Sequence, residues 1–363
     1  MGVEDILRGE LGELAAYVPA SPAGATVRLD ANEAPPPSSP EIRDAVRAAI
    51  SRVALERYPD ARALELKEAI AARTGAPASS IVVGTGSDEI IALLATACAR
   101  PRGRMTQGTV VAPTPTFVMY RVTARAHGLR AVDVPLDASW DLDLGSMKKA
   151  IDVMQPNVVF VASPNNPTGN RVSADRLEAL VLAAQDTLVV IDEAYVDYAA
   201  EGSLRALRER YANVAILRTL SKIGLAALRV GWIEAGEPIV RALDKARQPF
   251  NVSATSQAAA SAVLRDAWGA VREHVGAVVR ERERVATAIT ATRGARALPS
   301  DANFIWVETE KSAGAVYEAM LARGVLVRSF HAAGGRMARH LRVTIGTPAE
   351  NDAMIAALAE ACA

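Results

Sequence analysis

Short apolar runs alternate with helix-periodic stretches through the first two thirds of the chain. The predicted strands cover residues 81–83, 109–112, 131–134, 158–162, 188–191, 215–217 and 230–233. Between most of them, apolar residues recur at helical spacing over 88–99, 117–127, 144–154 and 174–184. This alternation is typical of crossover units built around a mostly parallel sheet. The unbroken apolar character of strands such as 188–191 indicates that helices cover both faces.

One connection departs from the crossover pattern. Only about a dozen residues separate the strand at 215–217 from the strand at 230–233, which is too few for a parallel crossover with a helix. We therefore expect these two strands to be antiparallel neighbours. Their tight connection, which we expect at an edge of the sheet, carries Lys222 and Arg229.

The last third of the chain has fewer predicted strands and a long predicted helix. A long helical stretch over 254–292 precedes short strands at 303–307, 325–328 and 341–345 and helices at 313–323 and from Pro348. We predict an N-terminal segment (1–45) that packs with a smaller α+β domain (251–363), and a large α/β domain (46–250) with a seven-stranded sheet containing one antiparallel strand. The proline-rich segment 34–37 is a stiff linker.

Composition and charge reduce the number of possible partners and cellular locations. The 363 residues carry 41 basic and 41 acidic side chains, so no basic excess favours nucleic acid as a partner. No apolar run approaches the ~18 residues of a membrane helix, and the N-terminus has no signal-peptide core. Cys98 and Cys362 form no disulfide framework, which favours a cytoplasmic protein. Neither they nor the four histidines have the spacing of metal ligands.

The segment Thr219-Leu220-Ser221-Lys222, with Arg229 seven residues after the lysine, is the most informative of the chain. It follows the buried strand at 215–217, where a lysine is poorly explained by packing. A desolvated lysine becomes a nucleophile toward carbonyls, and two hydroxyls with a guanidinium suit a phosphate. Together these features suggest pyridoxal 5'-phosphate, although a solvated surface lysine is the commoner outcome for such a residue.

Three further motifs follow predicted strands. Residues 84–88, Gly-Thr-Gly-Ser-Asp, lie between a strand and a helix that Ser87 or Asp88 would cap, and form either a phosphate cradle or an ordinary turn. Residues 163–169, Ser-Pro-Asn-Asn-Pro-Thr-Gly, form a rigid loop at a strand end, where ligands of α/β sheets gather. Asp192 ends the strand at 188–191, where it would pair a protonated pyridine nitrogen or cap a helix, and Tyr195 is placed to bond the ring oxygen.

These four motifs, in this order, resemble those of the fold type I pyridoxal-phosphate aminotransferases, and most closely the histidinol-phosphate aminotransferases. The resemblance runs from residues 29–33 (Leu-Asp-Ala-Asn-Glu) and 57–60 (Arg-Tyr-Pro-Asp) to 341–347 (Leu-Arg-Val-Thr-Ile-Gly-Thr). It implies transamination of L-histidinol phosphate with 2-oxoglutarate, giving imidazole acetol phosphate and L-glutamate in histidine biosynthesis. It also implies a homodimer with shared sites.

The resemblance assigns roles residue by residue. Lys222 matches the lysine that holds the cofactor, Asp192 the partner of the pyridine nitrogen, and Tyr195 and Asn166 those of the ring oxygen. The remaining matches are Gly86, Ser87, Asp88, Thr219, Ser221 and Arg229 at the phosphate, Phe117 on the ring, Tyr58 in the neighbouring subunit's site, and Tyr17, Asn32, Arg328 and Arg342 at the substrate. Tyr17 and Tyr58 fit ordinary interface aromatics about as well, and Arg328 fits a surface ion pair.

The chain also departs from the family pattern. Arg229 lies seven residues after Lys222 where many relatives have eight, Ala227 replaces a more usual glycine, and Phe117 replaces a ring-stacking tyrosine. An aromatic amino acid aminotransferase and a threonine-phosphate decarboxylase would use the same site. A non-catalytic regulator would need a DNA-binding segment, and a nucleotide-dependent dehydrogenase would need a complete glycine fingerprint.

Overall fold

A seven-stranded sheet forms the centre of the computed structural model, which describes residues 6–12, 14–16 and 24–363. The strands lie in the order β2-β8-β7-β6-β5-β3-β4. Their bounds are β2 Ile81–Thr85, β3 Thr109–Thr114, β4 Arg130–Pro135, β5 Val158–Ala162, β6 Leu188–Asp192, β7 Val214–Thr219 and β8 Val230–Glu234. Strand β8 runs antiparallel to the other six strands of this sheet, as predicted. The prediction that the β7–β8 connection lies at a sheet edge is wrong, because β2 pairs with the outer side of β8 and becomes the edge strand.

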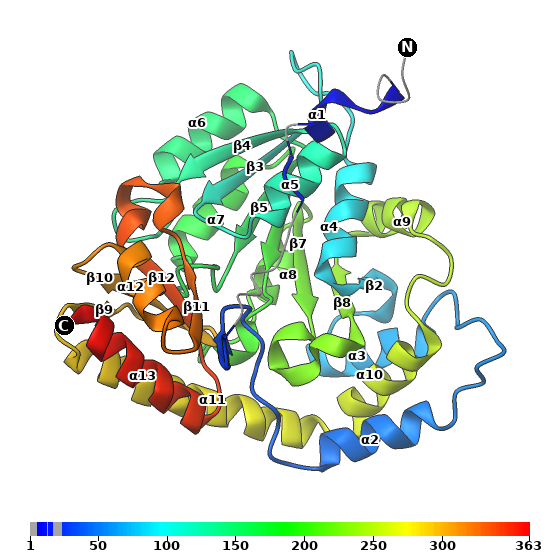
Figure 1. Ribbon diagram of the computed structural model, residues 1–363. Coiled ribbons are helices and arrows are strands. Elements are labelled where there is room, and N and C mark those ends of the chain that lie inside the picture. Colours follow the sequence, from blue (N-terminus) through cyan, green and yellow to red (C-terminus); the bar gives the residue numbers. More distant parts are fainter. Residues whose placement is uncertain (1–5, 13, 17–23) are drawn as a thin grey trace.

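Helices cover both faces of this sheet, and alternate side chains of each strand enter different cores (Figure 1). On β5, Val158 and Phe160 pack with helices α4, α5 and α9, whereas Val159 and Val161 pack with α6 and α7. The helix bounds are α4 Gly86–Ala97, α5 Met119–Ala126, α6 Leu144–Met154, α7 Ala174–Ala183, α8 Arg205–Arg210 and α9 Glu237–Ala246. Helix α4 begins at Gly86 without a side-chain cap, so the predicted capping by Ser87 or Asp88 is wrong.

A second, five-stranded sheet has the order β1-β11-β12-β10-β9. Its strands are β1 Val27–Leu29, β9 Ala295–Ala297, β10 Phe304–Thr309, β11 Val325–Ser329 and β12 His340–Thr344. Strand β1 pairs in parallel with β11, so the N-terminal segment joins the small sheet. Strands β1 and β9, three residues each, were not among the predicted elements. The predicted domain boundaries remain a prediction.

The remaining helices lie around the large sheet or pack on the small sheet. Their bounds are α1 Gly9–Gly12, α2 Glu41–Ile50, α3 Leu64–Thr74, α10 Ala254–Asp266, α11 Trp268–Ala291, α12 Ala313–Leu321 and α13 Pro348–Cys362. The helical stretch predicted over 254–292 is broken at Ala267 into α10, which packs on α2 and α3, and α11, which runs beneath both sheets (Figure 1). No helix in the described ranges is long and apolar enough to cross a membrane.

Candidate active site

The four motifs converge at one end of the large sheet, where β5, β6 and β7 terminate. Asp192 is the last residue of β6, Lys222 follows β7, and the loop with Asn166 follows β5. Because β2 also ends at this side, Gly86 lies beside Gly231 of β8, and a Cβ on Gly231 would come within 2.5 Å of the Gly86 backbone. The topology therefore brings Gly86 next to Arg229, which lies 143 positions further along the chain.

Asp192 is a buried carboxylate with two neutral hydrogen-bond donors. Its side chain is 4% exposed, its Oδ1 accepts the Ala194 amide at 3.0 Å, and its Oδ2 accepts the Tyr120 hydroxyl at 2.5 Å. Burial raises the pKa of Asp192 to about 6, against the opposing effects of those two donors and of Lys222. A carboxylate so placed has lone pairs left for a cationic N–H, which a protonated pyridine nitrogen would supply.

Lys222 lies in an irregular turn at Ser221–Leu225 whose residues Ile223 and Gly224 leave helical geometry. Its ammonium lies 5.9 Å from the centroid of the Tyr195 ring. The buried Tyr198 donates its hydroxyl to the Lys222 carbonyl at 2.6 Å, which fixes the backbone of the turn. The lysine is therefore anchored through its main chain while its side chain faces the Tyr195 ring.

Tyr195 is tied to the small sheet through Asn32. The side-chain nitrogen of Asn32 donates to the Tyr195 hydroxyl at 2.9 Å, and Asn32 also exchanges hydrogen bonds with Thr344 of β12. Asn303 donates to the Asn32 carbonyl at 3.0 Å. Asn32, expected at the substrate, therefore also orients the tyrosine expected at the cofactor oxygen.

Asn166 and Arg342 meet across the two sheets. Arg342, in β12, is 8% exposed and donates to the Asn166 side-chain oxygen at 2.6 Å and to the Asp30 carbonyl. The side chain of the neighbouring Asn165 instead accepts a hydrogen bond from Thr116 and donates one to Thr168 of the same loop. Of the paired asparagines, Asn165 holds the loop in shape and Asn166 presents its amide toward the arginine.

The phosphate-binding candidates surround the start of α4. Gly86 has φ of 78°, and a Cβ there would come within 2.6 Å of the Arg229 guanidinium. Arg229, with φ of 50°, lies 3.6 Å from Asp88, and both side chains are about half exposed. On the other side the hydroxyls of Thr219 and Ser221 are 2.9 Å apart, and both residues are buried. A helix N-terminus, two hydroxyls and a guanidinium thus share one small volume.

The other predicted residues lie around this centre. Phe117 is half-buried and contacts Tyr120 edge-on, with ring centroids 5.5 Å apart. Arg328 is exposed on β11, directly opposite Arg342 in the strand register. Tyr58 is 82% exposed and stacks on Phe250. Tyr17 lies outside the described residues.

Tyr120 and Tyr198 are functional candidates that the sequence motifs missed. Tyr120 contacts Asp192 and Tyr198 contacts the Lys222 main chain, yet neither belongs to a motif. A signal was available for Tyr120, because it lies three residues after Phe117 in the stretch predicted to be helical over 117–127, and residues at that spacing share a helix face. Tyr198 has no comparable signal.

The residues present fit pyridoxal 5'-phosphate. A buried carboxylate, which needs a cationic partner, lies at one end of the site. An amine on a fixed turn and an anion cradle, in which Gly86 leaves no room for a side chain, lie nearby. These groups suit a ring nitrogen, an aldehyde and a phosphate respectively.

A family model described as aminotransferase class I and II matches residues 25–358. The chain belongs to this aminotransferase family, whose cofactor is pyridoxal 5'-phosphate. Among curated proteins, it is 38% identical to a histidinol-phosphate aminotransferase of Chromobacterium violaceum over 357 residues, covering 98% of each chain. It is 39% identical to histidinol-phosphate aminotransferase 2 of Nitrosococcus oceani, covering 97% of this chain and 96% of that one.

Solved structures agree on the fold. A histidinol-phosphate aminotransferase of Sinorhizobium meliloti, in complex with pyridoxal-5'-phosphate, superposes with a TM-score of 0.82 at 28% identity, covering 93% of this chain and 91% of that one. A Thermus thermophilus aspartate aminotransferase variant superposes with a TM-score of 0.80 at 21% identity, covering 98% and 99%. The prediction of a fold type I aminotransferase is confirmed.

Proposed function

We propose that this chain transfers the amino group of L-histidinol phosphate to 2-oxoglutarate, giving imidazole acetol phosphate and L-glutamate. The observation that carries the proposal is the position of Arg342. Its guanidinium is buried and hydrogen-bonded to Asn166, beside the residues that fit the cofactor. Full-length relatives named histidinol-phosphate aminotransferase support the same substrate pair.

Each side chain has a definable task in this reaction. When bound, pyridoxal 5'-phosphate supplies an electron sink for the bond broken at the amino-bearing carbon. Lys222 would hold the cofactor and, once its Nζ is free, would take the proton from that carbon and deliver it to the cofactor carbon instead of back to the substrate. Asp192 keeps the ring nitrogen cationic, while Tyr195 and Asn166 bond the ring oxygen. Gly86, Ser87, Thr219, Ser221 and Arg229, with Asp88 beside them, hold the phosphate.

The two substrates share an anion near the reacting carbon. Histidinol phosphate carries a phosphate ester there and glutamate a carboxylate, and a planar guanidinium binds either in a bidentate manner. Arg328 pairs with Arg342 across β11 and β12, so both side chains emerge on the same face of the small sheet. A second cation on that face favours the phosphate dianion. Tyr17 remains a proposed contact.

A substrate panel tests the proposal. Steady-state kcat/KM is measured with 2-oxoglutarate and either histidinol phosphate or phenylalanine, and carbon dioxide release is measured with threonine phosphate. Histidinol phosphate should give the highest kcat/KM. A preference for phenylalanine would establish an aromatic aminotransferase, and carbon dioxide release from threonine phosphate would establish a decarboxylase.

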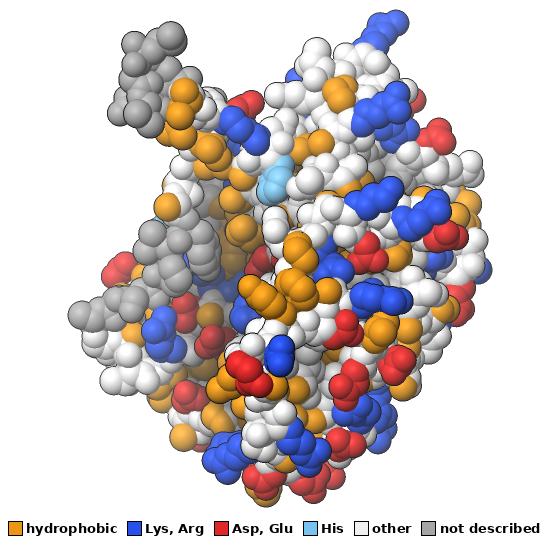
Figure 2. All heavy atoms as spheres, turned by 90° about the vertical axis from the view of Figure 1, so that its right-hand side faces the viewer, with side chains coloured by type: hydrophobic (Ala, Val, Ile, Leu, Met, Phe, Trp, Pro, Cys, Tyr) orange, Lys and Arg blue, Asp and Glu red, His pale blue; other side chains and the backbone are white. Residues whose placement is uncertain are grey.

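We further propose a cytoplasmic homodimer in which Tyr58 completes the partner's site. Tyr58 and Leu55 are more than four-fifths exposed, and Tyr58 stacks on the partly exposed Phe250, so an apolar surface is presented around residues 55–58. Apolar side chains gather on the face of the molecule that Figure 2 shows. Mixing two inactive proteins, Lys222→Ala and Tyr58→Ala, should restore activity, because one site of the mixed dimer then has both residues. Sedimentation as a monomer would contradict the proposal.

A further inference from the structure

The hydroxyl of Tyr120 lies against the carboxylate that we assign to the cofactor nitrogen. It donates to Asp192 Oδ2 at 2.5 Å, while the Ala194 amide occupies Oδ1 at 3.0 Å. Both residues are buried, with Tyr120 1% exposed and Asp192 4% exposed. A hydrogen bond to an ionised acceptor in such surroundings is stronger than one at a surface.

Packing fixes the direction of this hydroxyl. The Tyr120 ring stacks on Phe160 of β5 with centroids 4.5 Å apart and planes 1° from parallel. Phe117 contacts the Tyr120 ring edge-on. Two aromatic contacts therefore hold the ring, and its hydroxyl has little freedom to leave Asp192.

We propose that Tyr120 is a positioning residue that keeps Asp192 ionised and oriented, so that the shared proton resides on the cofactor nitrogen rather than on the carboxylate. This inference rests on the proposed function. Tyr120 acts through Asp192, and its hydroxyl is directed at that carboxylate.

Burial and the charged groups around Asp192 act in opposite directions on its ionisation. Lys222, in the turn after β7, favours the ionised form of Asp192, whereas burial and Asp88 of α4 disfavour it. Tyr195 and Asp88 also face Tyr120, and burial with the Asp192 charge raises the pKa of Tyr120 well above its ordinary value. The phenol therefore keeps its proton and donates it throughout the working pH range. Without the Tyr120 hydroxyl, Asp192 would keep the hydrogen bond from the Ala194 amide.

Tyr120→Phe tests the inference, with Tyr211→Phe as the matched control. The Tyr211 hydroxyl also donates to a carboxylate, Glu178, at 2.6 Å, but between α7 and the end of α8. In protein freed of cofactor, the carboxyl stretch of Asp192, identified by its loss in Asp192→Asn, is followed by infrared spectroscopy against pH. Loss of a hydrogen bond to a charged group should raise the Asp192 midpoint by about one pH unit or more in Tyr120→Phe. The control should leave it unchanged.

The loaded enzyme gives a second measurement. Tyr120→Phe should lower kcat by about tenfold or more, with a smaller change in KM, and should shift the pH titration of the cofactor absorbance. If Tyr120→Phe lowers the melting temperature but leaves the infrared midpoint in place, the tyrosine is only structural and the inference is wrong.

A second substitution tests the inference if Tyr120→Phe fails to fold. Incorporating 3-fluorotyrosine at position 120 makes the phenol more acidic, so the stronger donor should lower the Asp192 midpoint; an unchanged midpoint would also overturn the inference. The infrared measurement needs no turnover. A chain that shows these midpoints but rejects histidinol phosphate would disprove the proposed substrate and leave the role of Tyr120 intact.

Discussion

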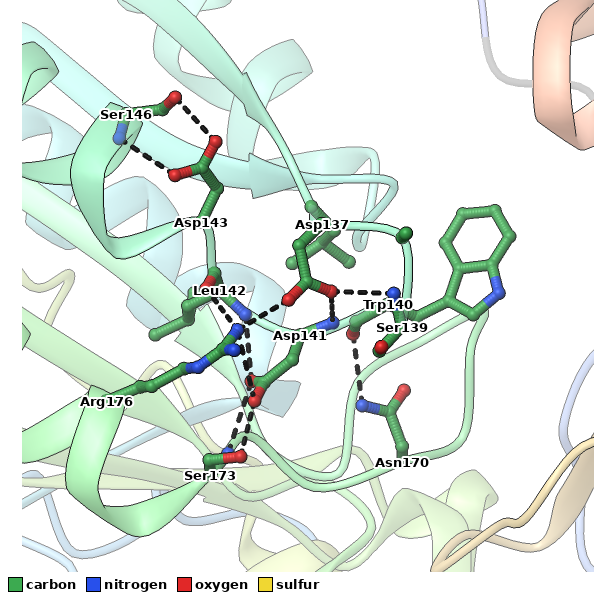
Figure 3. A network of polar contacts seen from close by, with 12 residues as sticks. Asp137, Ser139, Trp140, Asp141, Leu142, Asp143, Ser146, Asn170, Ser173 and Arg176 are labelled. Carbon is green, nitrogen blue, oxygen red and sulfur yellow. Dashed lines mark hydrogen bonds and ion pairs between the residues drawn. The ribbon is translucent and has the colours of Figure 1, made fainter.

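Two aspartates that follow strands of the same sheet have opposite surroundings. Asp192, at the end of β6, accepts hydrogen bonds from a phenol and an amide, both neutral, and burial raises its pKa to about 6. Asp137, just beyond β4, accepts the Arg176 guanidinium at 2.5 Å and the amides of Ser139 and Asp141 at 2.8 and 3.0 Å (Figure 3). Burial opposes its charge, but Arg176 and the two amides together lower the pKa of Asp137.

The charged groups of the Asp137 network are paired with one another. Arg176 also lies 3.5 Å from Asp141 and donates to the Leu142 carbonyl at 2.7 Å, and Asp141 in turn accepts the hydroxyl and amide of Ser173. Figure 3 shows these groups pointing toward one another from the β4–α6 connection and the start of α7. The loop is held by charges that pair with one another, whereas the hydrogen bonds that the buried Asp192 accepts come from two neutral donors. That difference separates a structural carboxylate from one prepared for a cationic ligand.

Lys222→Ala should have the largest effect at the reactive end of the sheet. Loss of the amine that carries the cofactor and moves the proton should reduce kcat by at least about 10³-fold. The melting temperature of the cofactor-free protein should change little. Steady-state assays and calorimetry measure both, and full turnover in the variant would refute the assignment of Lys222.

Arg342→Ala should weaken both half-reactions by about 10- to 100-fold in kcat/KM, because one guanidinium serves both anions. Stopped-flow absorbance of each half-reaction separates the two effects. A defect confined to one half-reaction would mean that phosphate and carboxylate use different sites. Arg323→Ala, which removes an exposed arginine paired with Glu360, is the control and should leave both rates unchanged.

Asp137→Ala should separate stability from catalysis. The variant removes the shortest partner of the Arg176 guanidinium and the acceptor of the Ser139 and Asp141 amides, so its unfolding free energy should fall. Its kcat should stay near the wild-type value. Urea unfolding and a steady-state assay test this; a large loss of kcat with unchanged stability would mean that the two regions are not separable in the way their contacts indicate.

The pH dependence of stability should have opposite signs in the two regions. Asp192 has a folded-state pKa near 6, above its ordinary 3.8, so its contribution to the stability of cofactor-free protein is lost as pH rises from about 4 to 6. The pKa of Asp137 is lowered, so its contribution is present above 3.8 and lost as pH falls below it. Unfolding free energies of wild type, Asp192→Asn and Asp137→Asn across pH 3–7 give the two slopes. Equal slopes would contradict the comparison.

The sequence predicted most of the large sheet because its strands are continuous apolar runs. Strand β5 and helix α6 have the predicted bounds, and the short span between β7 and β8 indicated their antiparallel pairing. Strand β1 was missed because three residues carry little periodicity, and its pairing with β11 joins positions 298 apart. The edge position of β2 also required tertiary information.

The candidate site was predictable where residues form motifs and not where they only meet in space. Asp192, Lys222 and Asn166 each follow a strand in a recognisable segment. The contact of Tyr120 with Asp192 spans 72 positions, and the contact of Arg342 with Asn166 spans 176. No local pattern reports such pairs, because they depend on how the sheets are placed relative to each other.

Asn32 sets a condition for building chimeric enzymes from this scaffold. It hydrogen-bonds Tyr195 on one side and Thr344 on the other, while Asn303 donates to its carbonyl. A small sheet transplanted from another aminotransferase would have to bring a matching junction with it. Otherwise the graft would fold around a tyrosine with no fixed orientation, and altered substrate preference could not be separated from altered cofactor chemistry.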